Sequence, residues 1–407
     1  IVKAAIEKDM PILGISRGHQ IMTVAFGGKL YQDLNENEKA AYIWDLSSVN
    51  AGTNSDWDNS YKQMFYSNIV LDGIEKQGKS VDVDQIKGAA LFYRSYAYFN
   101  LLQVFALPYQ LGKNSPEPTI PLPLSSDINA ERHKPTLVEA YQRIIEDLTL
   151  AGELLPDEVS IKSRPDKKAS QSLLARIYFL MGDFVTAELH LSKLCENDSM
   201  LLDYNSIDES LNRPFPSVYP AGPGNSEVIF YSPFISYYYL SSNNVQVHVA
   251  DDLLNSYGEN DLRKGLYFRD RGDGIFTFKG SYGGVQRGGD LFTGLSHDEN
   301  YLNYAECLIR NSKIDQGINV LNRLLQTRYL VNNYEPYQVQ ARDEALEIVL
   351  AERRKSLVGK GTRWFDIRRF ISDSKWFISD EREIGGKIYK LELNDKRVRF
   401  EMPLNEQ

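Results

Sequence analysis

The stretch AERRKSLVGKGTRWFDIRRF, residues 351–370, holds the densest pattern in the chain because it gathers glycines, aromatic rings and arginines in one run. Just before and within its start, apolar side chains recur every three to four residues, at Leu346, Val349 and Leu350. This spacing predicts a helix over Ala341–Leu357 whose last turn is basic. We expect Gly359 and Gly361 to end it.

After these glycines, large apolar side chains alternate with charged ones as far as Phe370. We expect the rings to be buried and the arginines to pair with Glu352 and Asp366, because a buried charge needs a partner. This arrangement favours an intramolecular clamp over a binding site. RNA is not an expected partner, because the whole chain carries a net charge of −9.

The order ERR-x-x-L-x-x-x-G-x-RWFD, which runs from Glu352 to Asp366, resembles the C-terminal signature of the SusD/RagB family of outer-membrane nutrient-binding lipoproteins. Two more stretches resemble family segments: WDNSYKQMFYSNIVLDGI from Trp57 and DQIKGAALFYRSYAYFNLLQVF from Asp84. The resemblance extends over about residues 40–400.

This resemblance implies a mainly α fold: a SusD-like scaffold of tetratricopeptide-like helix pairs with irregular loops and small β elements. It also implies a non-catalytic protein that captures an oligosaccharide for a TonB-dependent outer-membrane transporter, and that is lipid-anchored and surface-exposed on the cell outer membrane. A peptide ligand is the alternative within the same family. No cofactor is implied.

The first 34 residues have a different character. PILGISRGHQIMTVAFGGKLYQDL, from Pro11, reads as a strand, a sharp turn at Ser16 and a helix, and it resembles the nucleophile segment of class I glutamine amidotransferase-like hydrolases that act on gamma-glutamyl-gamma-aminobutyrate. Those hydrolases carry cysteine where this chain has Ser16. We therefore expect an amidotransferase-like fragment at 1–34, with gamma-glutamyl hydrolysis through Ser16 as a remote alternative, followed by an N-terminal helical region at 35–200 and a C-terminal region at 201–407.

Helix signals recur along the chain, and proline separates some of them. Thr136 with Glu139 forms a capping-box pattern, and Arg94 falls inside an apolar helix where it needs an acidic or carbonyl partner. The connection 107–135 is rich in proline and is expected to be extended. The expected helices are Trp57–Ile74 (with Tyr61, Phe65, Ile69 and Leu71 inward), Val83–Phe105, Thr136–Leu155, Lys168–Leu180, Phe184–Cys195, Glu299–Arg310 and Ile314–Gln326.

The segment Met200–His297 shows little helical periodicity and much glycine, proline and tyrosine. A short strand is expected at Glu227–Tyr231, hairpin character at Gly272–Gly294, and a closing β element after Arg382. Cys195 and Cys307 are expected to be separate buried thiols. No apolar run reaches the length of a membrane span, and no signal peptide or acceptor cysteine is seen near Ile1, so export is expected from the resemblance alone.

Aromatic and amide side chains supply the ligand-site prediction, because flat rings stack on sugars and amides bind hydroxyls. These side chains cluster before the first long helix and occur again in the later loops. No catalytic or metal-binding residues are predicted, because the five histidines and two cysteines form no ligand pattern. The predicted ligand-binding residues are Tyr42, Trp44, Asn50, Asn54, Trp57, Tyr238 and Tyr282.

Overall fold

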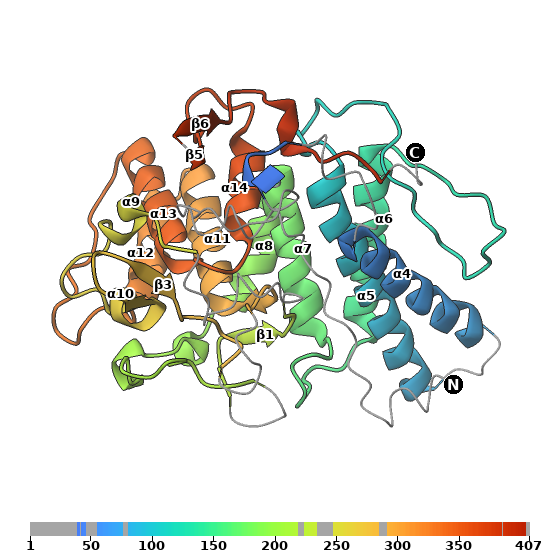
Figure 1. Ribbon diagram of the computed structural model, residues 1–407. Coiled ribbons are helices and arrows are strands. Elements are labelled where there is room, and N and C mark those ends of the chain that lie inside the picture. Colours follow the sequence, from blue (N-terminus) through green and yellow to red (C-terminus); the bar gives the residue numbers. More distant parts are fainter. Residues whose placement is uncertain are drawn as a thin grey trace.

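The computed structural model describes residues 39–40, 42–45, 55–75, 80–218, 224–233, 247–284, 291–384 and 386–403. Helices dominate this part of the chain, as expected (Figure 1). The long helices are α4 (Ser55–Ile74), α5 (Val81–Phe105), α6 (Leu137–Leu154), α7 (Lys167–Met181), α8 (Phe184–Leu194), α11 (His297–Arg310), α12 (Ile314–Gln326), α13 (Arg342–Ser356) and α14 (Thr362–Phe370).

Helices that follow one another in the chain pack side by side: α4 on α5, α5 on α6, α6 on α7, α7 on α8 and α11 on α12. Helix α8 also contacts α11, so α7–α8 and α11–α12 lie next to each other although about a hundred residues separate them (Figure 1). The turn after α7 is closed by Gly182 at φ 82°, a conformation that favours glycine. These contacts confirm the predicted scaffold of helix pairs.

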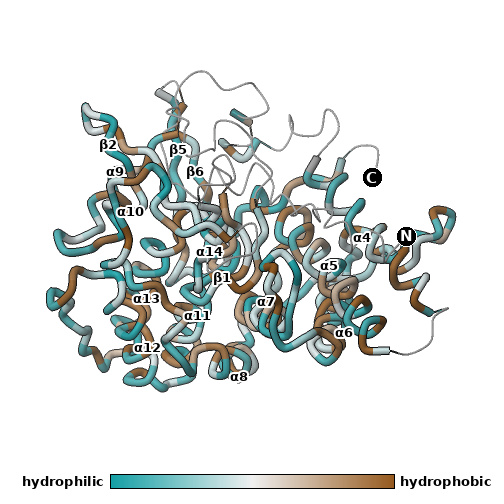
Figure 2. The backbone as a smooth tube through the Cα atoms, turned by 90° about the horizontal axis from the view of Figure 1, so that it is seen from below, coloured by the Kyte–Doolittle hydropathy of each residue, from teal (hydrophilic) through white to brown (hydrophobic). Residues whose placement is uncertain are grey.

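Helix α5 is the central element. Every residue from Ala90 to Phe105 is buried, which explains why its sequence is apolar nearly all round. Figure 2 shows hydrophobic stretches along α5 and α7, each of which packs against α6. Arg94 has the acidic partner that the sequence called for, Asp147, at 2.6 Å from Nη2, and it also bonds the side-chain oxygen of Asn68, at 2.9 Å from Nη1.

Asn68 also decides which face of α4 turns inward. Its Nδ2 donates to the carbonyl oxygen of Pro123 at 2.9 Å, and its side chain is completely buried. The sequence-based expectation that Phe65 and Ile69 point inward was wrong, because both remain more than a third exposed. A buried amide needs its hydrogen bonds, so the polar partners of Asn68 outweigh the apolar gain of the alternative face.

The stretch 351–370 forms the expected clamp. Gly359 and Gly361 both adopt φ 74° between α13 and α14. The indole Nε1 of Trp364 donates to the carbonyl oxygen of Gln103 on α5 at 2.9 Å, and Asp366 accepts from Arg353 at 2.9 Å. Each of these groups is buried and partnered, so the clamp joins the C-terminal helices to the central helix.

Glu352 finds its arginine on another element. Arg263, from α10 (Leu262–Tyr267), lies 2.8 Å from its carboxylate, and Lys355 also pairs with it. Arg263 bonds Asp261 at 2.6 Å as well, so the acidic residue of the clamp is tied to the irregular middle of the chain. The sequence pattern predicted the pairing of Glu352 but not the origin of its partner.

Short antiparallel strand pairs join the irregular segments. They are β1 (Val228–Phe230) with β4 (Leu295–Ser296), β2 (Phe268–Asp270) with β3 (Phe276–Phe278), and β5 (Glu381–Ile384) with β6 (Lys387–Lys390). The short helix α9 spans Asp251–Leu254, and the 3-10 turns are η1 (Asp198–Met200), η2 (Tyr204–Ser206) and η5 (Lys396–Val398). The expected strand near residue 398 is therefore part of a 3-10 turn.

Cys195 and Cys307 are free, buried thiols, as predicted. Burial raises the pKa of each thiol well above its usual value, so both stay protonated at neutral pH. Within the described ranges, no helix combines the length and apolar character needed to cross a bilayer.

Candidate functional site

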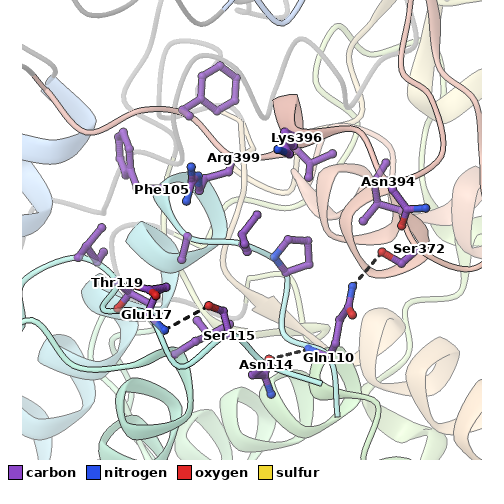
Figure 3. A pocket seen from close by; sticks show the side chains of 18 of the residues that line it. Phe105, Gln110, Asn114, Ser115, Glu117, Thr119, Ser372, Asn394, Lys396 and Arg399 are labelled. Carbon is purple, nitrogen blue, oxygen red and sulfur yellow. Dashed lines mark hydrogen bonds between the residues drawn. The ribbon is translucent and has the colours of Figure 1, made fainter. Parts of the chain in front are cut away.

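A cavity of about 460 Å³ opens where α5 ends. Its walls come from residues 105–120, from Leu137 at the start of α6, from the two residues that follow α14, and from the C-terminal segment 394–402 (Figure 3). Its volume falls in the range of small-molecule sites. Segments far apart in sequence therefore meet around one hollow.

The first wall exists because α5 stops at Phe105. Leu107 precedes Pro108, and a residue before proline avoids the helical region, so the chain turns away in an extended conformation. A turn then forms: the backbone N–H of Gln110 donates to Oδ1 of Asn114 at 2.8 Å, and Gly112 adopts φ 73°. This turn holds the polar side chains of the wall in place.

The opposite wall is fixed to α14 and α5 by backbone hydrogen bonds. The N–H of Asn394 donates to the carbonyl oxygen of Ile371 at 2.7 Å, and the N–H of Phe400 donates to that of Val104 at 2.9 Å. Asn394 adopts φ 63°, which asparagine tolerates better than most residues. Both ends of the segment are therefore anchored, and the cavity lies between the anchors and the first wall.

One side-chain hydrogen bond links the two walls directly. Nε2 of Gln110 donates to Oγ of Ser372 at 2.8 Å, which Figure 3 shows along one edge of the cavity. The lining also offers the amide of Asn394 and the hydroxyls of Ser115 and Thr119, together with apolar side chains such as Phe105. Such a lining can accept and donate hydrogen bonds to a polyol while covering its apolar faces.

Three basic side chains line the cavity and are largely exposed: Lys113, Lys396 and Arg399. None of the ion pairs among the described residues includes them. Of the lining carboxylates, Asp395 is bound by Arg397, whose Nη2 lies 2.6 Å away. Burial raises the pKa of Asp395, but the hydrogen bonds from Arg397 leave it below its usual value, so this group stays anionic at neutral pH.

A fourth cation, Arg368, lies buried next to the lining. Its guanidinium donates to the carbonyl oxygens of Leu102 (3.2 Å), Ala106 (2.8 Å) and Val398, and its Nε has no partner. No carboxylate among the described residues pairs with it. Burial, together with the nearby charge of Arg399, lowers the pKa of Arg368 to about 10, so it remains positive at neutral pH. Two of these carbonyls belong to the C-terminal end of α5, whose dipole supplies about half a negative charge.

Tyr42 and Trp44 lie apart from this lining, beneath Arg382. The Arg382 guanidinium lies 4.7 Å from the ring centre of Tyr42 and 4.0 Å from that of Trp44, and it donates to the Tyr42 carbonyl oxygen. Their exposed fractions are 2% and 0%. A ring that stacks on a sugar has to present a face, so the structure gives these rings a packing role and their part in ligand binding stays a prediction.

Trp57 and Tyr282 are also buried. The Trp57 ring contacts Phe105 edge to face, with 5.0 Å between ring centres, so it supports a cavity wall from behind. The Tyr282 hydroxyl donates to Glu227 at 2.5 Å and its ring lies 3.7 Å from Nζ of Lys360, inside a separate charged network. Ligand binding by either residue stays a prediction.

Asn50, Asn54 and Tyr238 lie outside the described residues, as does Ser16. Of the predicted residues that the structure describes, which are Tyr42, Trp44, Trp57 and Tyr282, none lines the cavity. Sequence reasoning missed the lining because its residues show no helical or strand periodicity. The available signal was local: amide side chains around Gly112, in a proline-rich connection.

Two family models match the chain, and both describe SusD-type proteins. Residues 18–179 match the family described as starch-binding and associating with the outer membrane, and residues 299–403 match the SusD family. Together the two matched ranges span about two thirds of the chain. The first begins at residue 18, inside the range expected for the amidotransferase-like fragment, so the predicted boundary at residue 34 stays a prediction.

Among curated relatives, SusD-like protein P2 of Formosa agariphila is 23% identical over 351 residues, which cover 70% of this chain and 65% of that protein. A glutamine amidotransferase-like protein, YvdE of Lactococcus lactis, is 57% identical over only 35 residues, which cover 9% of this chain and 15% of that protein. The chain thus spans less than two thirds of the length of either relative.

Solved structures show the same fold at low identity. A SusD superfamily protein from Bacteroides thetaiotaomicron superposes with a TM-score of 0.75 at 20% identity, and covers 98% of this chain and 95% of its own. A SusD-like carbohydrate binding protein from Bacteroides vulgatus gives a TM-score of 0.75 at 18% identity, and covers 95% of this chain and 89% of its own. These likenesses establish the mainly helical SusD-like fold.

Proposed function

Because the chain belongs to the SusD/RagB family, we propose that it binds an oligosaccharide in the cavity at the end of α5 and delivers it to a TonB-dependent outer-membrane transporter. The observation that carries the proposal is the lining itself. Amides and hydroxyls, among them Gln110, Asn394 and Thr119, line a hollow of about 460 Å³ together with apolar side chains. This combination suits a sugar, which has hydroxyls at its edges and apolar faces.

The similarity to a carbohydrate binding protein of the same fold supports this ligand class. The role is non-catalytic: affinity comes from hydrogen bonds and apolar contact in a preformed site. The family description, which associates such proteins with the outer membrane, supports a place at that membrane, and the proposal adds a lipid anchor. Moderate affinity is sufficient for this role, because the ligand has to be released again to the transporter.

Asn394 provides the test. Its side-chain amide lines the cavity, and glycine tolerates its φ of 63° without strain, so Asn394→Gly removes the amide with little effect on the backbone. The matched control is Asn332→Gly, because exposed Asn332 also adopts φ 63° and does not line the cavity. Loss of one hydrogen bond is worth about 1 kcal/mol, or about a fivefold weaker affinity.

The measurement is isothermal titration of the chain and both variants with a panel of neutral and acidic oligosaccharides and oligopeptides. The expected result is binding of at least one glycan, weakened by Asn394→Gly and unchanged by Asn332→Gly. Binding of peptides without any glycan would replace the proposed ligand class by the peptide alternative. Glycan binding that both variants leave intact would move the site away from this cavity.

A further inference from the structure

We infer that the cavity at the end of α5 selects oligosaccharides that carry negative charge, as carboxylate or sulfate groups, and that Arg399, Lys396 and Lys113 recognise that charge. This inference rests on the proposed function and adds to it the chemical class of the ligand. It comes from the distribution of charge around the cavity, which differs from that of the chain as a whole.

The first step concerns the three lining cations. Lys113 comes from the connection after α5, and Lys396 and Arg399 come from the C-terminal segment, so they approach the hollow from both walls. Each lacks an ion-pair partner among the described residues. A cation without a carboxylate partner keeps its capacity for a charged ligand, whereas a paired cation first has to give up its partner.

The second step concerns Arg368. Its charge lies against Ala106 and Val398, which are themselves lining residues, and it is satisfied by carbonyl oxygens instead of a carboxylate. Carbonyls meet the hydrogen-bonding needs of a guanidinium but do not cancel its full charge. Its positive potential therefore reaches the cavity through a poorly polarisable interior, where charges are weakly screened.

The third step is the balance of charge. Among the described residues that line the cavity, three cations stand against the carboxylates of Glu117 and Glu401, while Asp395 is bound by Arg397. Arg368 adds a fourth positive charge next to the lining. A positive excess remains after the half charge at the end of α5 is counted. The chain as a whole carries a net charge of −9, so composition does not account for this excess. A cavity with an excess of positive charge attracts negatively charged ligands.

The experiment compares acidic oligosaccharides (galacturonate, alginate and carrageenan fragments) with neutral ones of equal length, by isothermal titration at 50 and 500 mM NaCl. We expect at least one acidic glycan to bind about tenfold more tightly than its neutral counterpart, and to lose most of that advantage at high salt because exposed charges are then screened. Arg399→Gln should weaken the affinity for the acidic glycan about tenfold and leave the affinity for the neutral glycan unchanged. Lys193→Gln, on exposed α8 surface outside the lining, is the matched control.

Two failures are distinguishable. Neutral glycans that bind as well as acidic ones, or acidic binding that neither salt nor Arg399→Gln weakens, would overturn the charge selectivity while leaving the proposed function standing. Absence of binding by every glycan of either class would overturn the proposed function itself. The melting temperature of Arg399→Gln, whose side chain is exposed, should equal that of the unchanged chain, which verifies that altered affinity does not come from unfolding.

Discussion

Replacing Arg176 by methionine should destabilise the chain strongly, because it breaks the ion pair that ties α7 to α11. The Nε and Nη2 of Arg176 donate to the two carboxylate oxygens of Glu299 at 2.7 and 2.5 Å, and Nη2 also donates to the carbonyl oxygen of Gly294 at 2.7 Å. Both side chains are about 2% exposed. Among the described residues Glu299 has no second cationic partner.

Methionine fills much of the arginine volume but leaves the Glu299 carboxylate buried and unpaired. Such a change costs about 3–5 kcal/mol of the free energy of unfolding. The double variant Arg176→Met/Glu299→Met should lose less free energy of unfolding than the two single variants lose together, because no buried charge is then left without a partner. Lys313→Met, which breaks a pair with Glu188 in which Lys313 is 46% exposed, should change the free energy of unfolding little.

Urea unfolding at pH 7, followed by circular dichroism, measures all four variants against the unchanged chain. Arg176→Met should lower the free energy of unfolding far more than the surface control Lys313→Met does. A cost below 1 kcal/mol for Arg176→Met, or strictly additive costs in the double variant, would show that this buried pair does not act as described.

Two further predictions concern α11 and its neighbour α12. Burial raises the pKa of Glu306, but its ion pairs with Arg369 and Arg310 exceed this effect and lower the pKa to about 2 from 4.5. The carboxylate therefore contributes about 3 kcal/mol of stability above pH 4.5, and this contribution is lost as the pH falls toward 2. In acid unfolding, Glu306→Gln should lose less stability than the unchanged chain between pH 6 and pH 3, and equal losses would contradict the assignment. Gly317→Ala should cost about 1–3 kcal/mol in urea unfolding, because the added Cβ would lie 2.8 Å from the Ala305 carbonyl oxygen, and a neutral result would mean that α11 and α12 can move apart freely.

Much of the local structure was predictable because it depends on neighbouring residues. The Thr136 cap with Glu139, the helix bounds of the two hairpins and the glycine break after α13 all follow from short-range rules. Pairing of Arg94 was also predictable, because a buried guanidinium needs an acceptor. Its particular partners, Asp147 and Asn68, were not, because periodicity does not say which helices become neighbours.

The candidate site was not predictable for the same reason. Its walls meet through the Gln110–Ser372 hydrogen bond, which spans 262 residues of sequence, and through contacts of the C-terminal segment with α5. The aromatic residues chosen from the sequence, such as Trp44, are chemically suited to stacking on a sugar, yet the structure buries Trp44 beneath Arg382. Residue type indicates what a side chain can do, whereas exposure decides whether it can reach a ligand.

The sequence by itself determined the helices, their caps and stops, and the family signature at Glu352–Asp366, because capping, periodicity and chain geometry act within a few residues. Only the tertiary structure decided which face of α4 is buried, which acid pairs with Arg176, and where Arg368 places an unpaired charge. Those outcomes depend on contacts between residues far apart in the chain, and the energy of each contact depends on burial, which is a property of the whole fold.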